Sequence, residues 1–263
     1  MGDLNVYTYK SYHENSWCKM ADHYPQILWR CMGEERVGSY EYYNKTTKDA
    51  ADICGASQGS SSAAKRPEPV SRQERARYSE EVRSIEERGL KQWAIENQLW
   101  ITEADFQGRY GSRQIGAGAE QKVYLHEDGL TVLKVNAGRF HGNWLEYFNR
   151  LLFHAFLFPA TKYATVGFTE ANEEFAVITE QPFAILSKGT PRVVVQTYLL
   201  SQGISHFKND DYYSKSTSVK LEDLHDENVF LDDDGNLLFI DPVIYFETPD
   251  LKLGGEMVFH FPF

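Results

Sequence analysis

The residues best suited to chemistry lie in two late segments of the chain, Asp223-Leu224-His225-Asp226-Glu227-Asn228 and Phe239-Ile240-Asp241-Pro242. Asp223 and Asn228 are five positions apart, and Asp241 follows Asn228 by thirteen. Transfer of a phosphoryl group needs oxygen ligands for magnesium and a carboxylate near the incoming hydroxyl. A tight loop followed by a hairpin brings such side chains together, so the spacing indicates a phosphoryl-transfer site.

Other residues of these segments have simpler interpretations. The run from Asp232 to Asp234 has neither the ligand spacing nor the terminal glutamate of a calcium loop, so it predicts a turn. His225 is able to serve acid-base chemistry, but its side chain is expected to support the backbone of the loop. Asp226 and Glu227 are expected to be exposed carboxylates, with a further metal contact as the alternative.

A glycine-rich segment, Ile115-Gly116-Ala117-Gly118-Ala119, lies between two predicted strands. Gly116 and Gly118 carry no Cβ, so backbone N–H groups there are able to approach phosphate oxygens closely. By itself the pattern is typical of an ordinary hairpin. The strand that follows argues against a dinucleotide-binding fold, in which a helix would begin at this point.

Lys134 lies within an apolar strand, Thr131-Val132-Leu133-Lys134-Val135. Burying a lysine is costly unless its ammonium group meets an anion such as a phosphate or a carboxylate. Glu146 follows twelve residues later on a predicted helix. Either residue alone is typical of surface charge, but after a glycine-rich turn the two together predict an ion pair that positions a phosphate.

The strands that must position these residues are predicted from short β-like runs separated by glycine, aspartate and asparagine. Four strands are expected, at residues 122–125, 131–135, 164–169 and 175–179. Glu127-Asp128-Gly129 fits a hairpin turn between the first two. A last hairpin is expected around the turn Asp232-Asp233-Asp234-Gly235-Asn236.

Two helices are expected among the strands. The first runs from residue 143 to about 156 and is ended by Pro159. The second has Thr190 as its N-cap, Pro191 in its first position and Gly203 beyond its end. The order of strands, helix, strands, helix and hairpin predicts the α+β class, with an antiparallel first half.

The N-terminal part of the chain is expected to have three segments. Residues 1–54 form an extension rich in aromatic residues, and their pattern predicts no particular structure or role. Residues 55–70 form a flexible linker, because a run of Gly, Ala and Ser has little to bury and two prolines follow it. Residues 71–106 form a helical connector.

The helix of this connector has a recognisable start. Ser71 and Glu74 fit a capping box, in which each side chain satisfies a backbone N–H. Tyr78 and Val82 recur on one face of the helix, and Gly89 is the expected stop. Its mixed charges predict a solvated face, with a docking surface as the alternative.

Composition narrows the class of protein. The 263 residues include 38 acidic and 27 basic side chains, for a net charge of -11. This surplus disfavours nucleic acid and anionic membranes as partners. Three cysteines without a metal-binding spacing argue against a disulfide scaffold, and no signal peptide or membrane-spanning run is recognisable. We expect a soluble, cytoplasmic protein.

The segment from about residue 113 to residue 244 resembles a protein-kinase-like fold. It is most similar to the kinase domain found in polyvalent proteins of phages and conjugative elements. The string Asp223-Leu224-His225-Asp226-Glu227-Asn228 also resembles the catalytic loop of aminoglycoside and choline phosphotransferases. The resemblance implies a bilobal domain at 107–263, with an N-lobe at about 107–180 and a reduced C-lobe at about 181–263.

The resemblance also implies roles for the nucleotide-binding residues, with ATP and Mg²⁺ as cofactors. Gly116 and Gly118 would cover the phosphates, and Lys134 would hold the α- and β-phosphates while pairing with Glu146. The run Ile178-Thr179-Glu180-Gln181-Pro182, directly after a strand, would be the hinge that offers backbone groups to adenine. Within it, Thr179 and Glu180 are the expected contacts.

For the late segments, the resemblance implies that Asp223 orients or deprotonates the acceptor hydroxyl of a protein or a small molecule. Asn228 and Asp241 would hold magnesium. The sequence departs from the protein-kinase pattern at Gln121, which replaces the third glycine, and at Pro242, and only 22 residues follow Asp241. The alternatives are a pseudokinase that binds nucleotide or a partner without transfer, and an AMP transferase. The oligomeric state is left open.

Overall fold

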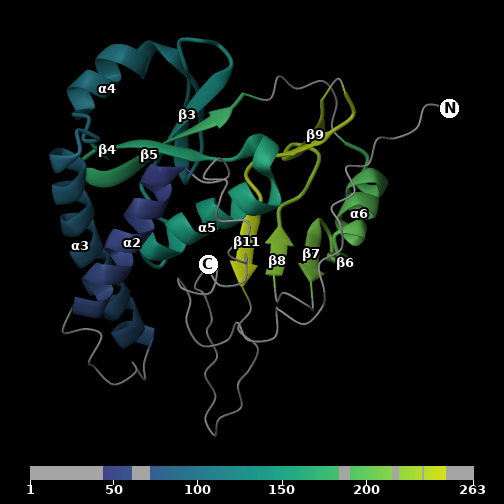
Figure 1. Cartoon of the computed structure of the whole chain (residues 1–263), viewed down its shortest axis with the longest axis horizontal. Helices are drawn as coiled ribbons and strands as arrows, with labels where there is room; N and C mark the ends of the chain where they lie inside the picture. Colours follow the sequence, from purple (N-terminus) through teal and green to yellow (C-terminus); the bar gives the residue numbers. More distant parts are fainter. Residues whose placement is uncertain (1–43, 61–71, 184–189, 215–218, 233, 247–263) are drawn as a thin grey trace, which may run out of the picture.

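The computed structural model describes residues 44–60, 72–183, 190–214, 219–232 and 234–246. Within these ranges the chain combines helices with two antiparallel sheets and a separate hairpin, which agrees with the predicted α+β class. Figure 1 shows helix α5 (Trp144–Leu157) at the centre, with the first sheet above it and the second sheet to its right.

The first sheet has five strands in the order β1-β2-β3-β5-β4, and every neighbouring pair is antiparallel. Its strands are β1 (Gln114–Ala117), β2 (Gln121–Leu125), β3 (Thr131–Asn136), β4 (Ala164–Ala171) and β5 (Glu174–Pro182). The four predicted strands are confirmed. The fifth, β1, supplies the first arm of the glycine-rich hairpin.

The two faces of this sheet are covered differently. Leu133 and Val135 of β3 pack with Phe106 of helix α4 (Glu103–Tyr110). Because side chains alternate along a strand, Lys134 lies on the opposite face. On that face β5 presents Thr179, which is paired directly with Lys134.

The predicted turn between β2 and β3 is confirmed. The Asp128 carboxylate accepts hydrogen bonds from the backbone N–H groups of Leu130 and Thr131, at 2.8 and 3.0 Å. Gly129 has φ of 67°, a conformation that glycine adopts without a steric penalty. This chemistry is local, which is why the sequence reveals it.

Helix α5 joins the two halves of the molecule. Asn143 caps its start by accepting a hydrogen bond from the backbone N–H of Glu146 at 2.8 Å. Its first turns bury Trp144 and Phe148 in the core under the first sheet, and further along Phe153 enters the core of the second sheet. The predicted helix is therefore confirmed, and it anchors both cores.

Two further helices pack on α5, namely α2 (Lys45–Ser60) and α3 (Arg72–Glu96). Helix α2 contradicts the prediction of a flexible linker for residues 55–60. The reason is tertiary, because the small side chains of Ala50, Ala51 and Cys54 are buried against the aromatic core around α5. Residues 61–70 of the predicted linker lie outside the described residues.

Gly89 is not a helix stop, because α3 continues to Glu96. A Cβ at Gly89 would lie 2.9 Å from the Ser57 hydroxyl of α2, so glycine here allows the two helices to approach closely. The side chains of the predicted capping box, Ser71 and Glu74, lie outside the described residues.

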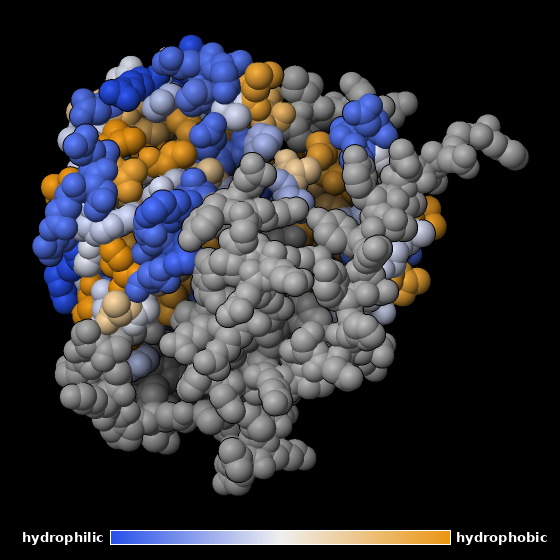
Figure 2. Space-filling view, viewed as in Figure 1, coloured by the Kyte–Doolittle hydropathy of each residue, from blue (hydrophilic) through white to orange (hydrophobic). Residues whose placement is uncertain are grey.

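The polar face predicted for α3 is exposed to solvent. Its exposed residues recur every four positions, at Glu80, Ser84, Arg88 and Gln92. Figure 2 shows hydrophilic surface along the outer edge of α3 and over α4. This arrangement agrees with an amphipathic helix that buries one face only.

The second sheet has four strands in the order β11-β8-β7-β6. Its strands are β6 (Ser205–Lys208), β7 (Asp211–Ser214), β8 (Val219–Glu222) and β11 (Val243–Phe246). The predicted last hairpin is confirmed as β9 (Val229–Leu231) paired with β10 (Leu237–Phe239). The sequence did not predict β6, β7, β8 and β11.

Helix α6 (Arg192–Ser201) packs on this sheet through Val195 and Leu199. Its predicted N-cap is wrong by one residue, because Pro191 occupies the cap position and no side chain caps the helix. Gly203 follows the helix with φ of 76°, as expected for a C-terminal stop.

Two short 3-10 helices, η3 (Gly111–Arg113) and η4 (Pro159–Thr161), precede β1 and β4. None of the helices in the described ranges has the length and apolar composition needed to span a bilayer.

Candidate active site

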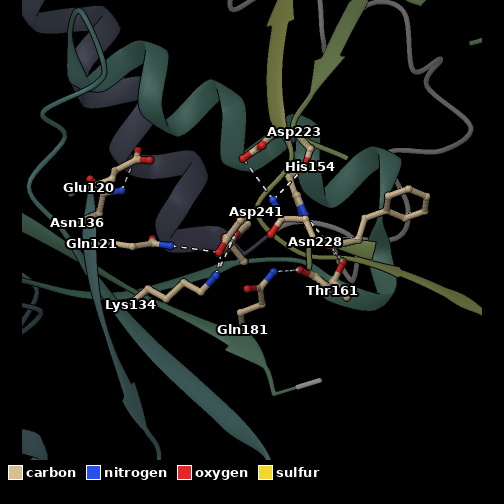
Figure 3. Close-up of polar contacts among 12 residues, drawn as sticks. Glu120, Gln121, Lys134, Asn136, His154, Thr161, Gln181, Asp223, Asn228 and Asp241 are labelled. Atoms are coloured by element: carbon tan, nitrogen blue, oxygen red, sulfur yellow. Dashed lines mark hydrogen bonds and ion pairs between the residues drawn. The ribbon is translucent and has the colours of Figure 1, made fainter. Parts of the chain in front are cut away.

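Four of the residues predicted to do chemistry come from three parts of the chain that meet beside α5. Lys134 lies in β3, Asp241 lies between β10 and β11, and Asp223 and Asn228 lie between β8 and β9. Figure 3 shows Lys134, Gln121 and Asn228 arranged around Asp241. The structure therefore brings the late loops to the lysine of the first sheet.

Lys134 and Asp241 form an ion pair. Lys134 Nζ lies 2.5 Å from Asp241 Oδ1, and the two side chains are 5% and 39% exposed. The Tyr163 hydroxyl also bonds to Asp241 Oδ1. Burial opposes ionisation of Asp241, but the charge of Lys134 and the hydrogen bonds from Lys134 and Tyr163 outweigh it, so the pKa of Asp241 lies below its usual value.

Asp223 and Asn228 lie on one short loop. The Asn228 amide nitrogen donates to the Asp223 carbonyl oxygen at 2.9 Å and to the Asp223 carboxylate at 3.3 Å. The Asp223 side chain is 55% exposed, so it faces solvent. The Asn228 backbone carbonyl oxygen accepts a hydrogen bond from the backbone N–H of Ile240 at 2.8 Å, which joins this loop to the segment that carries Asp241.

Both aspartates have left-handed backbone conformations, with φ of 66° at Asp223 and 54° at Asp241. Residues other than glycine seldom adopt positive φ, and such positions cluster at functional sites. The backbone therefore holds both carboxylates in orientations that an extended strand would not give.

His225 supports this loop, as the sequence predicted. Its Nδ1 accepts a hydrogen bond from the backbone N–H of Glu227 at 3.2 Å. Since a neutral imidazole carries one hydrogen, Nε2 is then the donor, and it lies 3.2 Å from Asp223 Oδ1. Asp226 and Glu227 are exposed.

The glycine-rich hairpin bends toward Asp241. Gly118 N–H donates to the Gln121 carbonyl oxygen at 2.9 Å, which closes the turn that begins after Gly116 in β1. The Gln121 amide nitrogen donates to Asp241 Oδ2 at 3.2 Å. The side chain that replaces the third glycine is thus directed into the site.

Glu120, at the tip of this hairpin, contacts the loop between β3 and α5. Its carboxylate lies 2.9 Å from His141 Nε2 and accepts from the Asn136 amide at 3.2 Å. Burial raises its pKa, but the hydrogen bond and charge of His141 and the Asn136 bond outweigh this effect, so the pKa of Glu120 lies below its usual value. These contacts hold the hairpin tip over the site.

The predicted ion pair between Lys134 and Glu146 is wrong for this structure. Glu146 lies in the first turn of α5, where its carboxylate accepts the backbone N–H of Gly142 at 3.1 Å. It also pairs with Arg150 at 2.8 Å. The helix start and its neighbour on the next turn therefore engage Glu146, and Asp241 is the carboxylate that meets Lys134.

Thr179 and Glu180 do not follow a strand, because β5 extends to Pro182. Thr179 is opposite Lys134 on β3 and opposite Thr165 on β4, and its side chain is buried. Both residues thus lie inside the sheet, so the predicted position of the hinge after the strand is wrong. Their contact with a nucleotide stays a prediction.

The sequence did not predict a role for three buried residues that lie near the site. Tyr163 contacts Asp241, and its pKa is raised well above the usual range by burial and by the negative charge of Asp241. His154 Nε2 lies 3.2 Å from the Phe239 carbonyl oxygen, and the Thr161 hydroxyl donates to the same oxygen at 2.6 Å. Their sequence neighbourhood carries no motif, and Pro159 close by is the only local signal of a change in chain direction.

The oxygen atoms at this site suit magnesium. Asp241 offers a carboxylate, and the bond from the Asn228 amide nitrogen to Asp223 leaves the Asn228 amide oxygen as the group that a cation would contact. Magnesium in nucleotide sites is bound by one or two carboxylates together with phosphate oxygens. Among the residues that the structure describes, no group of three or more histidine, cysteine or acidic side chains lies close enough together to hold a metal ion.

A glycine-rich hairpin, a lysine in the neighbouring strand and two late acidic loops are together the arrangement of a kinase-like protein. A family model described as a serine/threonine/tyrosine kinase found in polyvalent proteins matches residues 83–248. The match covers more than half of the chain, so the chain belongs to this kinase family. The match also confirms the resemblance seen in the motifs of the sequence. No curated protein and no solved structure matches the chain.

Proposed function

We propose that the chain is an ATP- and Mg²⁺-dependent phosphotransferase that moves the γ-phosphoryl group of ATP to a hydroxyl on a protein or a small molecule. The observation that carries the proposal is the contact between Lys134 and Asp241. A cation and a carboxylate from distant parts of the chain meet under a glycine-rich hairpin, and a phosphate chain with its metal needs such a pair.

Each residue has a role in this proposal. Lys134 binds the α- and β-phosphates, and the backbone around Gly116 and Gly118 covers them. Asn228 and Asp241 hold Mg²⁺, which when bound neutralises negative charge on the phosphate oxygens. Glu146, by contrast, bonds to the backbone just before α5 and to Arg150, so it has no role toward the nucleotide in this proposal.

Asp223 is the proposed base. Its carboxylate is exposed, so an acceptor hydroxyl is able to reach it from solvent. The acceptor oxygen forms a bond to the γ-phosphorus as the bond to the β-γ bridging oxygen breaks, and Asp223 orients the hydroxyl or takes its proton. His225 Nε2, at 3.2 Å, keeps the Asp223 carboxylate in place.

We also propose the domain division that the sequence predicted. The first sheet with α5 corresponds to an N-lobe at about 107–180, and the second sheet with α6 corresponds to a reduced C-lobe at about 181–263. Residues 1–54 remain an extension, but α2 shows that part of it packs on the kinase-like region. Thr179 and Glu180 remain candidates for contact with the nucleotide, at the end of β5 that leads into the second half.

The test is incubation of the full chain with Mg²⁺ and ATP labelled on either the α- or the γ-phosphate, with and without a lysate as the source of acceptors. Label from the γ-phosphate alone is expected, and Asp223→Ala and Asp241→Asn should reduce it roughly 100-fold or more. Variants that keep wild-type turnover would overturn the assignment. Transfer of the α-label would favour the AMP transferase, and nucleotide binding without transfer would favour the pseudokinase.

A further inference from the structure

Lys134 has a second neighbour besides Asp241. Its Nζ lies 3.4 Å from the Tyr163 hydroxyl and 5.1 Å from the centre of the Tyr163 ring. We infer that Tyr163 is a positioning residue that holds Lys134 and Asp241 together, in the place that the sequence predicted for Glu146. The functional part of this inference, which concerns nucleotide binding, rests on the proposed function, and the structural part does not.

Glu146 is unable to serve Lys134 in this arrangement. One of its carboxylate oxygens bonds to the backbone N–H of Gly142, just before α5, and the other bonds to Arg150, one turn further along the helix. Glu146 is also the only acidic residue of α5. A group from outside the helix therefore has to complete the surroundings of the lysine.

Tyr163 is fixed firmly enough for this role. It is buried, and its ring makes an edge contact with the His154 ring, with the two centroids 4.7 Å apart. Two residues earlier, the Thr161 hydroxyl donates to the Phe239 carbonyl oxygen at 2.6 Å. The segment from 161 to 163 thus bonds at both ends to the segment from 239 to 241.

The hydroxyl also decides which oxygen of Asp241 is presented to a ligand. Tyr163 and Lys134 both bond to Oδ1, whereas the Gln121 amide bonds to Oδ2 from the glycine-rich hairpin. With Oδ1 held in this way, Oδ2 is directed toward the hairpin, under which the phosphates are proposed to bind. Tyr163 therefore acts through Asp241 and Lys134, without touching the nucleotide.

The structural part is tested on the full chain without nucleotide by urea unfolding of Tyr163→Phe, Asp241→Ala and the double variant. If the hydroxyl and the carboxylate act together, the double variant should change the unfolding equilibrium constant about tenfold less than the product of the two single changes. If the change in the unfolding equilibrium constant of the double variant equals the product of the changes in the two single variants, the two groups act independently and the inference is overturned.

The functional part is tested by calorimetry with Mg²⁺ and a non-hydrolysable ATP analogue, and this measurement also decides the matter if the double variant does not fold. Tyr163→Phe should weaken binding by about five- to tenfold in the otherwise wild-type chain, but by less than about twofold when it is added to Lys134→Met. Tyr212→Phe is the matched control, because Tyr212 is buried and its hydroxyl has no hydrogen-bond partner among the described residues.

The outcomes separate the two proposals. An equal loss with and without Lys134, or a larger loss for Glu146→Gln than for Tyr163→Phe, would show that Tyr163 does not position the lysine. If the wild-type chain binds no nucleotide, the proposed function fails, and the unfolding experiment alone decides whether Tyr163 holds the pair.

Discussion

Lys134 Nζ lies 2.5 Å from Asp241 Oδ1, although 107 residues separate the two in the chain. The contact joins β3 of the first sheet to the segment between the last two strands. Since Lys134 lies in the first sheet and Asp241 lies on the segment that leads into β11 of the second sheet, the geometry of the candidate site depends on how α5 and its neighbours hold the two sheets together. The following predictions address the contacts that do so.

Gln121→Ala is expected to strengthen binding of Mg²⁺-nucleotide. The Gln121 amide bonds to Asp241 Oδ2, so a metal that needs this oxygen has to displace it. A hydrogen bond of this kind contributes about 0.5–1.5 kcal/mol, which predicts a two- to tenfold lower dissociation constant. A nucleotide titration at several Mg²⁺ concentrations measures the change.

Gln92→Ala is the matched control, because Gln92 is an exposed glutamine on α3 far along the chain from the hairpin. Its dissociation constant should equal that of the wild type. Weaker binding by Gln121→Ala would instead mean that the amide contacts the ligand.

Glu86→Ala is expected to destabilise the fold by about 2–4 kcal/mol. The Glu86 carboxylate is fully buried and accepts the backbone N–H groups of Trp144 and Leu145, at 2.7 and 3.3 Å. Its removal leaves two donors at the start of α5 without that acceptor and takes a negative charge from the positive end of the helix dipole.

Urea unfolding measures this loss. Glu96 lies at the exposed end of α3, the helix that also carries Glu86. Glu96→Ala should change the free energy of unfolding by no more than about 0.5 kcal/mol. Equal effects at Glu86 and Glu96 would contradict the role given to the buried carboxylate.

The stability of the protein is expected to fall as the pH drops from 6.5 toward 4. Burial lowers the pKa of His154 to about 4, although the bond to the Phe239 carbonyl opposes this, whereas histidine in an unfolded chain titrates near 6.5. The unfolded chain therefore binds a proton that the folded chain does not. This contribution is fully present above pH 6.5 and is worth at most about 3 kcal/mol.

His154→Gln should lose this part of the pH dependence, so its free energy of unfolding should approach that of the wild type as the pH falls. The exposed His206→Gln should keep the wild-type slope. Parallel curves for the wild type and His154→Gln would count against a buried neutral histidine.

Thr161→Val is expected to cost about 1 kcal/mol of stability and to lower nucleotide affinity less than Tyr163→Phe does. The Thr161 hydroxyl bonds to the Phe239 carbonyl oxygen, which keeps His154 as a second partner. The variant therefore weakens the support of Asp241 without removing a group that contacts it. Thermal unfolding and a nucleotide titration are the two measurements, and an affinity loss larger than that of Tyr163→Phe would disprove this ranking.

The elements that the sequence predicted correctly are those with local causes. Asp128 and Gly129 form their turn with residues two or three positions away, and Asn143 caps α5 by bonding to Glu146 three positions later. Interactions of this range are visible in a single stretch of sequence. The loop that carries Asp223 and Asn228 belongs to the same class.

The errors have tertiary causes. The sequence predicted a linker at Gly55 and the small residues that follow it. These residues are helical because α2 buries small side chains against α3 and α5. Gly89 was predicted to end α3, but its missing side chain instead allows α2 to approach α3 closely. A small side chain permits both flexibility and tight packing, so only the neighbouring element decides between them.

By itself, the order of residue types predicts that a lysine from a buried strand meets an anion, because a buried lysine is costly without one, and that two aspartates from late loops lie near it. The tertiary structure alone decided which groups contact that lysine. Glu146 is engaged by the start of its own helix, whereas Tyr163 and Asp241 are brought to Lys134 by sheets and a helix that pack together. Choice of partner depends on distances between elements, and only side-chain packing sets those distances.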